Sequence, residues 1–165
     1  MQNNLLYFYL KYFESVDKML SNNDYFMGEA LRQAQLAFDA DEIPVGAVVA
    51  CKGKIIGKGY NQTQRLNDVT AHAEMIAITS ASSFLGSKYL NDCILYVTLE
   101  PCIMCAGAIA WAQLGGLVFG TDDKKKGFTI FNQDVLHPRT LVSSGVLKDD
   151  CEEILKYFFL KLRKK

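Results

Sequence analysis

The sequence predicts an α/β protein with three layers, in which helices cover both faces of one mixed, five-stranded sheet. Segments with helical spacing alternate along the chain with short segments that are almost entirely apolar. Strands that are apolar on both faces are typical of a sheet buried between two helical layers. With 165 residues, of which 50% are hydrophobic, the chain is long enough for one domain with a substantial core and short for two.

The first helix is predicted to begin near residues 21–24, a run of cap-forming side chains that precedes apolar residues at helical spacing. These apolar residues are Phe26, Ala30, Leu31, Ala34, Ala37 and Phe38. Residues 1–22 are rich in Tyr and Phe, and we treat them as an N-terminal extension without an assigned role. Residues 23–165 then form the single domain.

Two strands are predicted to follow as a hairpin. Pro44 opens the unbroken apolar run of residues 45–51, which is typical of a buried strand. Lys52 and Gly53 turn the chain into a second strand at residues 54–60. The polar stretch after it, residues 61–69, predicts a loop of the kind that often borders a functional site.

The second half of the chain continues the alternation. Thr70 is predicted to cap a helix from Ala71 to about Ser83, and Pro101 suits the first turn of a helix that continues through Trp111. The other predicted elements are strands at residues 93–99, 116–120 and 141–147 and a final helix at residues 149–163.

Composition excludes some classes of function. Lys plus Arg and Asp plus Glu both number 18, so the chain lacks a global basic field and would meet a nucleic acid through local patches. The longest early apolar run, residues 5–10, is too short to span a bilayer, and no secretory signal is evident. Five scattered cysteines fit a reducing compartment, so we expect a soluble, cytoplasmic protein.

Two short motifs carry the chemistry, and each lies where a predicted helix begins. They are His72-Ala73-Glu74 and Pro101-Cys102-Ile103-Met104-Cys105. Cys102 and Cys105 are three residues apart, so both thiols can bind one ion. With His72 they offer three good zinc ligands and leave the fourth tetrahedral position for water, as in catalytic rather than structural zinc sites.

Helix geometry constrains Glu74. Residues two apart lie on nearly opposite sides of a helix, so His72 and Glu74 can converge on one ion only if it lies beyond the helix end. Zinc with two thiolates and a neutral imidazole carries no net charge, so its water is a weaker acid than with neutral ligands alone. We therefore expect Glu74 to accept the proton of that water and to return it to a ring nitrogen and the leaving amine.

The two motifs also allow other interpretations. A single Cys-x-x-Cys can be redox-active, structural or incidental, but no thioredoxin-like context surrounds this one. With only two histidines a three-histidine zinc site is impossible, and His137 is expected to be an ordinary loop residue. A structural-zinc module that binds RNA would need a fourth protein ligand and gives Glu74 no function.

The His-x-Glu and Pro-Cys-x-x-Cys pair resembles the signature of the zinc cytidine/deoxycytidylate deaminase superfamily. A closer resemblance is to the bacterial tRNA-specific adenosine deaminases, over roughly residues 23–163. It is carried by residues 42–48, Asn61, residues 70–74, 95–108 and 118–120, and Phe158-Phe159. The resemblance implies a cytidine-deaminase-like fold for the catalytic domain and conversion of adenosine to inosine at wobble position 34 of a tRNA anticodon.

Carried over by position, the resemblance also implies substrate contacts. Asn61 would hydrogen-bond the target base, Ala73 would offer its backbone to the base edge, and Asp123 and Lys125 would lie near the flanking nucleotides. One zinc ion per subunit, a homodimer and an anticodon stem-loop contacted from both subunits are further implications. The chain departs from the family at Val69, which replaces the usual proline, and at residues 126–133.

RNA and a free base both remain open as substrate from the residues alone, since guanine deaminases resemble this chain around the metal too. RNA use predicts a local electropositive surface with aromatic platforms. Candidates are residues 124–126, which are three lysines, and the tail of residues 158–165. Both also have ordinary explanations, a solvated loop and a helix end whose basic residues complement the helix dipole.

Overall fold

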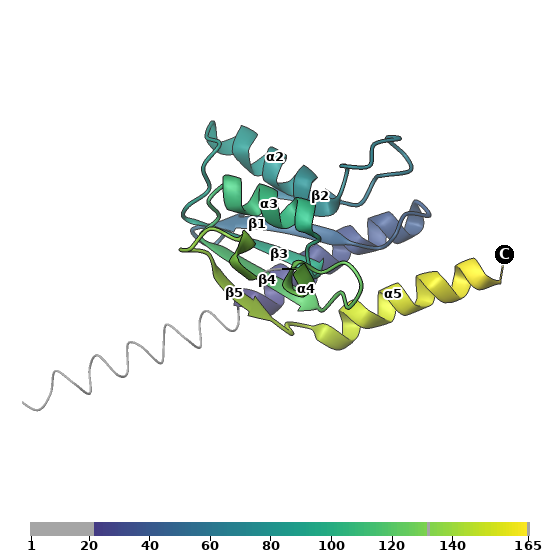
Figure 1. Ribbon diagram of the computed structural model, residues 1–165. Helices are drawn as coiled ribbons and strands as arrows, with labels where there is room; N and C mark the ends of the chain where they lie inside the picture. Colours follow the sequence, from purple (N-terminus) through teal and green to yellow (C-terminus); the bar gives the residue numbers. More distant parts are fainter. Residues whose placement is uncertain (1–21, 132, 165) are drawn as a thin grey trace, which may run out of the picture.

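The computed structural model describes residues 22–131 and 133–164. Within them the chain folds as the predicted three layers around one sheet (Figure 1). The predicted extension, residues 1–22, lies outside the described residues except for its last one.

The sheet is mixed and has five strands. They are β1 (Gly46–Cys51), β2 (Lys54–Tyr60), β3 (Cys93–Leu99), β4 (Gly116–Thr121) and β5 (Leu141–Ser144), in the spatial order β2-β1-β3-β4-β5. β1 pairs antiparallel with β2 and β3, whereas β3, β4 and β5 run parallel. β2, β3 and β4 therefore run in the same direction, and at their carboxyl ends β2 and β4 continue into polar connections.

Helices cover both faces of this sheet. α2 (Ala73–Leu85) and α3 (Ile103–Trp111) pack on one face, and the helix of residues 22–39 and α5 (Lys148–Arg163) pack on the other. The two hydrophobic clusters confirm that β1 is buried on both faces, because Ala47 and Val49 belong to one cluster and Val48 and Ala50 to the other.

Two glycines in β2 bring α2 unusually close to the sheet. A Cβ on Gly59 would collide with the carbonyl oxygen of Ala73, and a Cβ on Gly57 would collide with that of Ala77. Because the backbones touch here without an intervening side chain, the first turn of α2 has a fixed height above the sheet. The same contact therefore fixes the height of His72 and Glu74, which lie at that end of the helix.

Local boundaries differ from the predictions at both motif helices. α2 begins at Ala73 with His72 as its cap residue, because Thr70 directs both its backbone N–H and its hydroxyl to Asp68 Oδ1 at 2.8 and 2.7 Å. The prediction that Thr70 caps this helix was therefore wrong. Pro101 likewise precedes the cap of α3, which is Cys102, instead of lying in the first turn.

Two short elements were not predicted. α4 (Phe128–Phe131) forms in the stretch that departs from the family pattern, and the 3-10 turn η1 (Gln133–Val135) begins at the last residue of that stretch. Phe128 is buried and packs edge-on against Phe119, which ties this stretch to β4. Among the described residues no helix combines the length and apolar character needed to cross a bilayer.

Candidate metal centre and substrate pocket

Two helix N-termini bring the three predicted metal ligands together. His72 and Cys102 are the cap residues of α2 and α3, both with extended backbone, and neither side chain caps its own helix. Cys105 is the third residue of α3 and is fully buried. The ligand atoms of these three side chains lie within 4.8 Å of one another. The requirement that both motifs begin helices is thus confirmed.

The spacing of these atoms fits zinc. The Sγ atoms of Cys102 and Cys105 lie 3.7 and 3.5 Å from His72 Nδ1. Tetrahedral zinc, at about 2.3 Å from sulfur and about 2.0–2.1 Å from nitrogen, places such ligands about 3.5 Å apart. Within the described residues the group contains these three members and no fourth. A structural site closed by four protein ligands is therefore disfavoured in this part of the chain.

Contacts among the three ligands shift their pKa values. The hydrogen bond from Cys105 lowers the pKa of Cys102 to about 4, with His72 adding to the effect. The same hydrogen bond, together with burial, raises the pKa of Cys105. The hydrogen bond with Cys102 raises the pKa of His72. The positive ends of two helix dipoles also favour the thiolate form of a cysteine at this position.

Glu74 completes the floor of the site. It is the second residue of α2 and only 4% exposed, and it interacts with both His72 and Cys105. Burial raises the pKa of its carboxyl group. A buried carboxylate with a raised pKa is a stronger base than a free one, so it can take a proton and give it back. We call His72, Glu74, Cys102 and Cys105 the metal floor.

The metal floor opens into a pocket of about 650 Å³. All four predicted substrate-contact residues, Asn61, Ala73, Asp123 and Lys125, line it. Two loops contribute to its lining, and we call these the rim loops: residues 61–69 after β2, through Asn61 and Thr63, and residues 122–127 after β4, through residues 122–126. His72, Glu74 and Cys102 line it as well, whereas Cys105 is fully buried and does not.

The first rim loop depends on a residue that sequence reasoning did not single out. The carboxylate of Glu42 is buried and accepts hydrogen bonds from Arg65 N at 2.7 Å and Gln64 N at 3.2 Å. Longer contacts of 3.4 Å join it to Thr63 Oγ1 and to Asn61 Nδ2. Because a carboxylate only accepts hydrogen bonds, Glu42 fixes which way the Asn61 amide faces.

The second rim loop depends on Glu100 in the same way. Its carboxylate is buried and accepts hydrogen bonds from Asp123 N at 2.9 Å, Thr129 N at 3.0 Å and Thr129 Oγ1 at 2.7 Å. The side chain of Asp123 in turn accepts from the backbone N–H groups of Lys125 and Lys126. Asp123 therefore shapes the loop that presents the lysines, in addition to lining the pocket.

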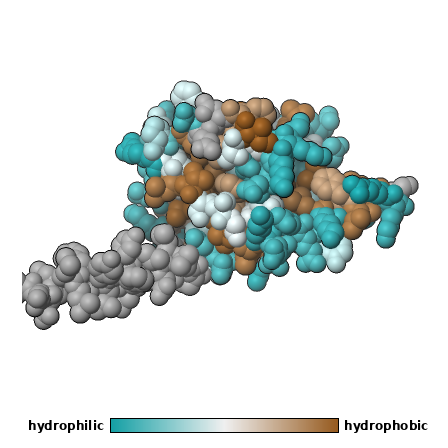
Figure 2. All heavy atoms as spheres, turned by 60° about the horizontal axis from the view of Figure 1, so that its bottom comes forward, coloured by the Kyte–Doolittle hydropathy of each residue, from teal (hydrophilic) through white to brown (hydrophobic). Residues whose placement is uncertain are grey.

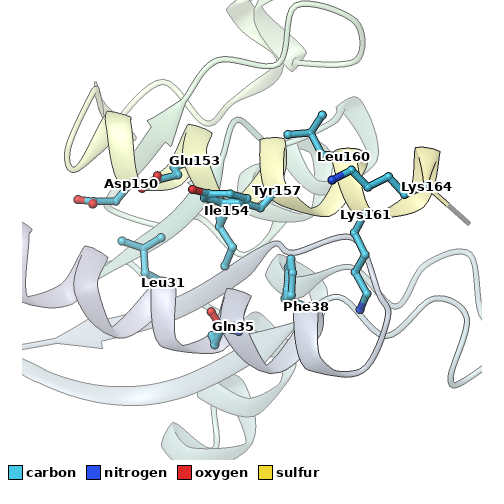
Figure 3. Close-up of a pocket in the computed structure, with 10 residues that line it drawn as sticks. All are labelled: Leu31, Gln35, Phe38, Asp150, Glu153, Ile154, Tyr157, Leu160, Lys161 and Lys164. Carbon is cyan, nitrogen blue, oxygen red and sulfur yellow. The ribbon is translucent and has the colours of Figure 1, made fainter.

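α5 forms the remaining wall and separates two hollows. Glu152, Leu155 and Phe159 face the pocket, whereas the opposite side of α5 lines a groove of about 760 Å³ against the helix of residues 22–39 (Figure 3). The close-up places Phe38 and Tyr157 in this groove with acidic side chains at one end and lysines at the other. None of the metal floor residues lines it.

The two aromatic residues of the tail, Phe158 and Phe159, lie in different environments. Phe158 is buried against Phe38, with ring centroids 5.9 Å apart, so it packs the helix as the ordinary explanation expects. Phe159 is 44% exposed and lines the pocket. Apolar surface continues along the projecting end of α5 up to its hydrophilic tip (Figure 2).

Comparisons with known proteins agree with this geometry. Residues 21–163 match the family model described as MafB19-like deaminase. The chain is 43% identical over 145 residues to a tRNA-specific adenosine deaminase of Aquifex aeolicus, covering 85% of this chain and 95% of the relative.

Solved structures give the same picture. A structure from work on A-to-I editing by tRNA:A34 deaminases at the wobble position of transfer RNA is 43% identical, with a TM-score of 0.75, and covers 79% of this chain and 99% of that one. A guanine deaminase from Nitrosomonas europaea is 25% identical, with a TM-score of 0.71, over 82% of this chain and 83% of that one.

Proposed function

The chain belongs to the tRNA-specific adenosine deaminases, within the MafB19-like deaminase family, and we propose that it is a zinc-dependent hydrolase that converts adenosine to inosine at wobble position 34 of a tRNA anticodon. The observation that carries the proposal is the convergence of three metal ligands and the buried carboxylate of Glu74 at the floor of one pocket. The overall reaction consumes one water and releases ammonia.

His72, Cys102 and Cys105 would hold one zinc ion per subunit. When bound, zinc supplies Lewis-acid activation of the water that attacks ring carbon C6 of adenine. The two helix N-termini that carry the ligands also favour negative charge at this position. The chain's own residues then have to manage the protons and hold the base.

Glu74 is the residue placed to move protons. It accepts one proton as the new C6–O bond forms and delivers it to a ring nitrogen. It then passes the remaining proton to the amino group as the C6–N bond breaks, so that ammonia leaves and inosine remains. Its raised pKa suits both directions, because a carboxyl group that binds its proton firmly is a better base and still a usable acid.

Asn61 and Ala73 are the residues that we propose hold the base. Asn61 is only 6% exposed and Ala73 is fully buried, yet both line the pocket. We propose that the Asn61 amide hydrogen-bonds the adenine and that the Ala73 backbone meets its edge. Asp123 and Lys125, on the second rim loop, would lie beside the flanking nucleotides.

Features of the pocket mouth support RNA over a free base. Residues 124–126 place three exposed lysines along the rim, and Phe159 adds an exposed aromatic ring. Cations for phosphates and an aromatic surface for stacking are the means by which proteins hold single-stranded loops. A free nucleobase carries no phosphate and has no use for the lysines.

A homodimer is a further part of the proposal. The outer side of α3 carries Ile103 and Trp111, eight residues apart and therefore on one face, exposed by 45% and 85%. Between them Gly107 leaves space unfilled above the helix. A second copy would cover this apolar face, and we further propose that the protein works in the cytoplasm, where tRNA is modified.

One comparison of substrates tests the function. The zinc-loaded protein is incubated with a tRNA that carries adenosine at position 34, with its anticodon stem-loop, with free guanine and with cytidine, and inosine and ammonia are measured. We expect inosine from both RNAs. Guanine turnover without inosine in either RNA would overturn the tRNA assignment and leave a guanine deaminase, while absence of turnover with every substrate would overturn the enzyme itself.

A further inference from the structure

Each rim loop has backbone hydrogen bonds of its own, and in addition several of its groups converge on one buried carboxylate that belongs to neither the metal floor nor the loop itself. Glu42 is 1% exposed and follows the helix of residues 22–39, and Glu100 is 4% exposed and follows β3. Both therefore lie shortly after a helix or strand of the domain core. Each reaches a loop more than fifteen residues away in sequence, Glu42 over 19 to 23 residues and Glu100 over 23 to 29.

The partners of these carboxylates are loop groups and not cations. In the described part of the chain neither Glu42 nor Glu100 forms a salt bridge, and their oxygens are used by backbone N–H groups, hydroxyls and one amide. Burying an acidic side chain is costly unless it is well hydrogen-bonded. Since apolar residues would fill the space at lower cost, these side chains are best explained by what they hold in place.

The contacts fall at the positions that define each loop. Glu42 binds Asn61 and the backbone of Gln64 and Arg65, which together form the first half of the loop of residues 61–69. Glu100 binds Asp123 and Thr129, which bracket the loop of residues 122–127 at both ends. Gly127 leaves room for this arrangement, because a Cβ there would collide with the Glu100 carboxylate.

From these contacts we infer that Glu42 and Glu100 are positioning residues, each of which holds one rim loop in the arrangement that receives the substrate. The inference rests on the proposed function in so far as the substrate is RNA. Without its carboxylate a loop would spend less time in the receiving arrangement, and apparent affinity falls by that fraction. Substrate binding selects the correct arrangement again, so turnover at saturation should change little.

The experiment uses the zinc-loaded full chain with Glu42→Gln and, separately, Glu100→Gln. Glutamine keeps the shape but replaces one acceptor oxygen by an NH₂ group that faces other donors. We expect KM for the anticodon stem-loop to rise about tenfold in each variant, with kcat within about twofold and with zinc content unchanged. Equal loss of kcat with unchanged KM, or loss of zinc, would overturn the inference.

Hydrogen–deuterium exchange tests the positioning role of the two glutamates separately from the proposed deaminase function. Glu42→Gln should speed exchange at the amides of Gln64 and Arg65, and Glu100→Gln at those of Asp123 and Thr129, each without affecting the other loop. This readout needs no substrate, so it decides on the positioning role even if the unaltered protein deaminates no RNA. Unchanged exchange at both loops would refute the positioning role.

Glu29→Gln is the matched control. Glu29 also lies on the helix of residues 22–39 and its carboxylate is mostly buried, but it pairs with Arg32 and Lys58 on the surface of the fold away from the pocket. We expect this variant to keep the KM, the zinc content and the exchange of both rim loops. A rise in KM as large as that of Glu42→Gln would mean that loss of any such carboxylate has this effect.

Discussion

The metal floor and the rim loops line the same pocket but are built in different ways. The floor stands on the ends of two helices, and glycine contacts in β2 fix the height of α2 without any intervening side chain. The rim loops contain no helix or strand and are held by turn hydrogen bonds and by the side-chain oxygens of two glutamates. The floor is therefore positioned by backbone packing, and the rim by a few hydrogen bonds.

This difference predicts how the two regions respond to change. A backbone-built site should tolerate loss of nearby side chains and fail only when a reacting or ligating group is removed. A loop whose side-chain hydrogen bonds converge on one carboxylate should become more mobile after a single substitution, and substrate affinity should fall without being lost.

Removal of one metal ligand should have the largest effect. We expect His72→Ala to lose zinc and all measurable inosine formation, because two thiols alone hold the ion poorly and leave its geometry undefined. Zinc per subunit and inosine yield are measured on the same preparation. His137→Ala is the control, since it changes the other histidine of the chain and should keep both values. Full zinc occupancy in His72→Ala would contradict the ligand assignment.

Removal of the proton carrier should leave the metal and stop the chemistry. We expect Glu74→Gln to keep one zinc per subunit and to lower kcat by about 10²–10⁴-fold, the usual range for a general acid–base group. Single-turnover rates and zinc content provide the measurement. If activity persists near that of the unaltered protein, Glu74 does not carry the protons. If zinc is lost instead, its role is structural.

The floor could be predicted from sequence because its information is local. His72 and Glu74 are two residues apart and Cys102 and Cys105 three apart, so motif spacing and helix geometry already require them to meet at helix ends. The capping by Thr70 was wrong because Asp68 competes for the same groups, and a side chain two residues away is as plausible a partner as a helix end. That error moved a boundary without moving the site.

The residues that hold the rim loops could not be predicted from the sequence as the metal floor could. Asn61, Asp123 and Lys125 came from a resemblance, and the structure puts all three around the pocket, but their roles as substrate contacts stay predictions. Glu42 and Glu100 each stand one or two residues before a proline, a pattern that gives no indication of burial or of partners across the fold. α4 was missed because a four-residue helix offers no periodicity to detect.

A change in the rim should weaken binding without harming the floor. A Cβ at Gly127 would displace the Glu100 carboxylate, so we expect Gly127→Ala to raise KM for the stem-loop about tenfold while zinc content stays the same. Gly28→Ala is the control, because a Cβ there meets nothing within 4 Å and the residue lies in a helix. Equal KM values for the two variants would show that the Glu100 contact does not govern the rim.

The smallest effect should come from a rim side chain that is free in solvent. Lys125 is exposed and only its backbone is held, by Asp123, so its ammonium group can reach a phosphate without ordering the loop. We expect Lys125→Ala to raise KM about two- to threefold near physiological salt and to reduce the slope of log affinity against log salt by about 0.7, the value for one lost phosphate contact on a single strand. Fluorescence anisotropy of the stem-loop in the Glu74→Ala background measures this slope. Lys88→Ala, an equally exposed lysine in the connection before β3 and outside the pocket lining, should leave the slope unchanged. If both lysines alter the slope equally, RNA is attracted by the general surface charge and the rim has no special place for a phosphate.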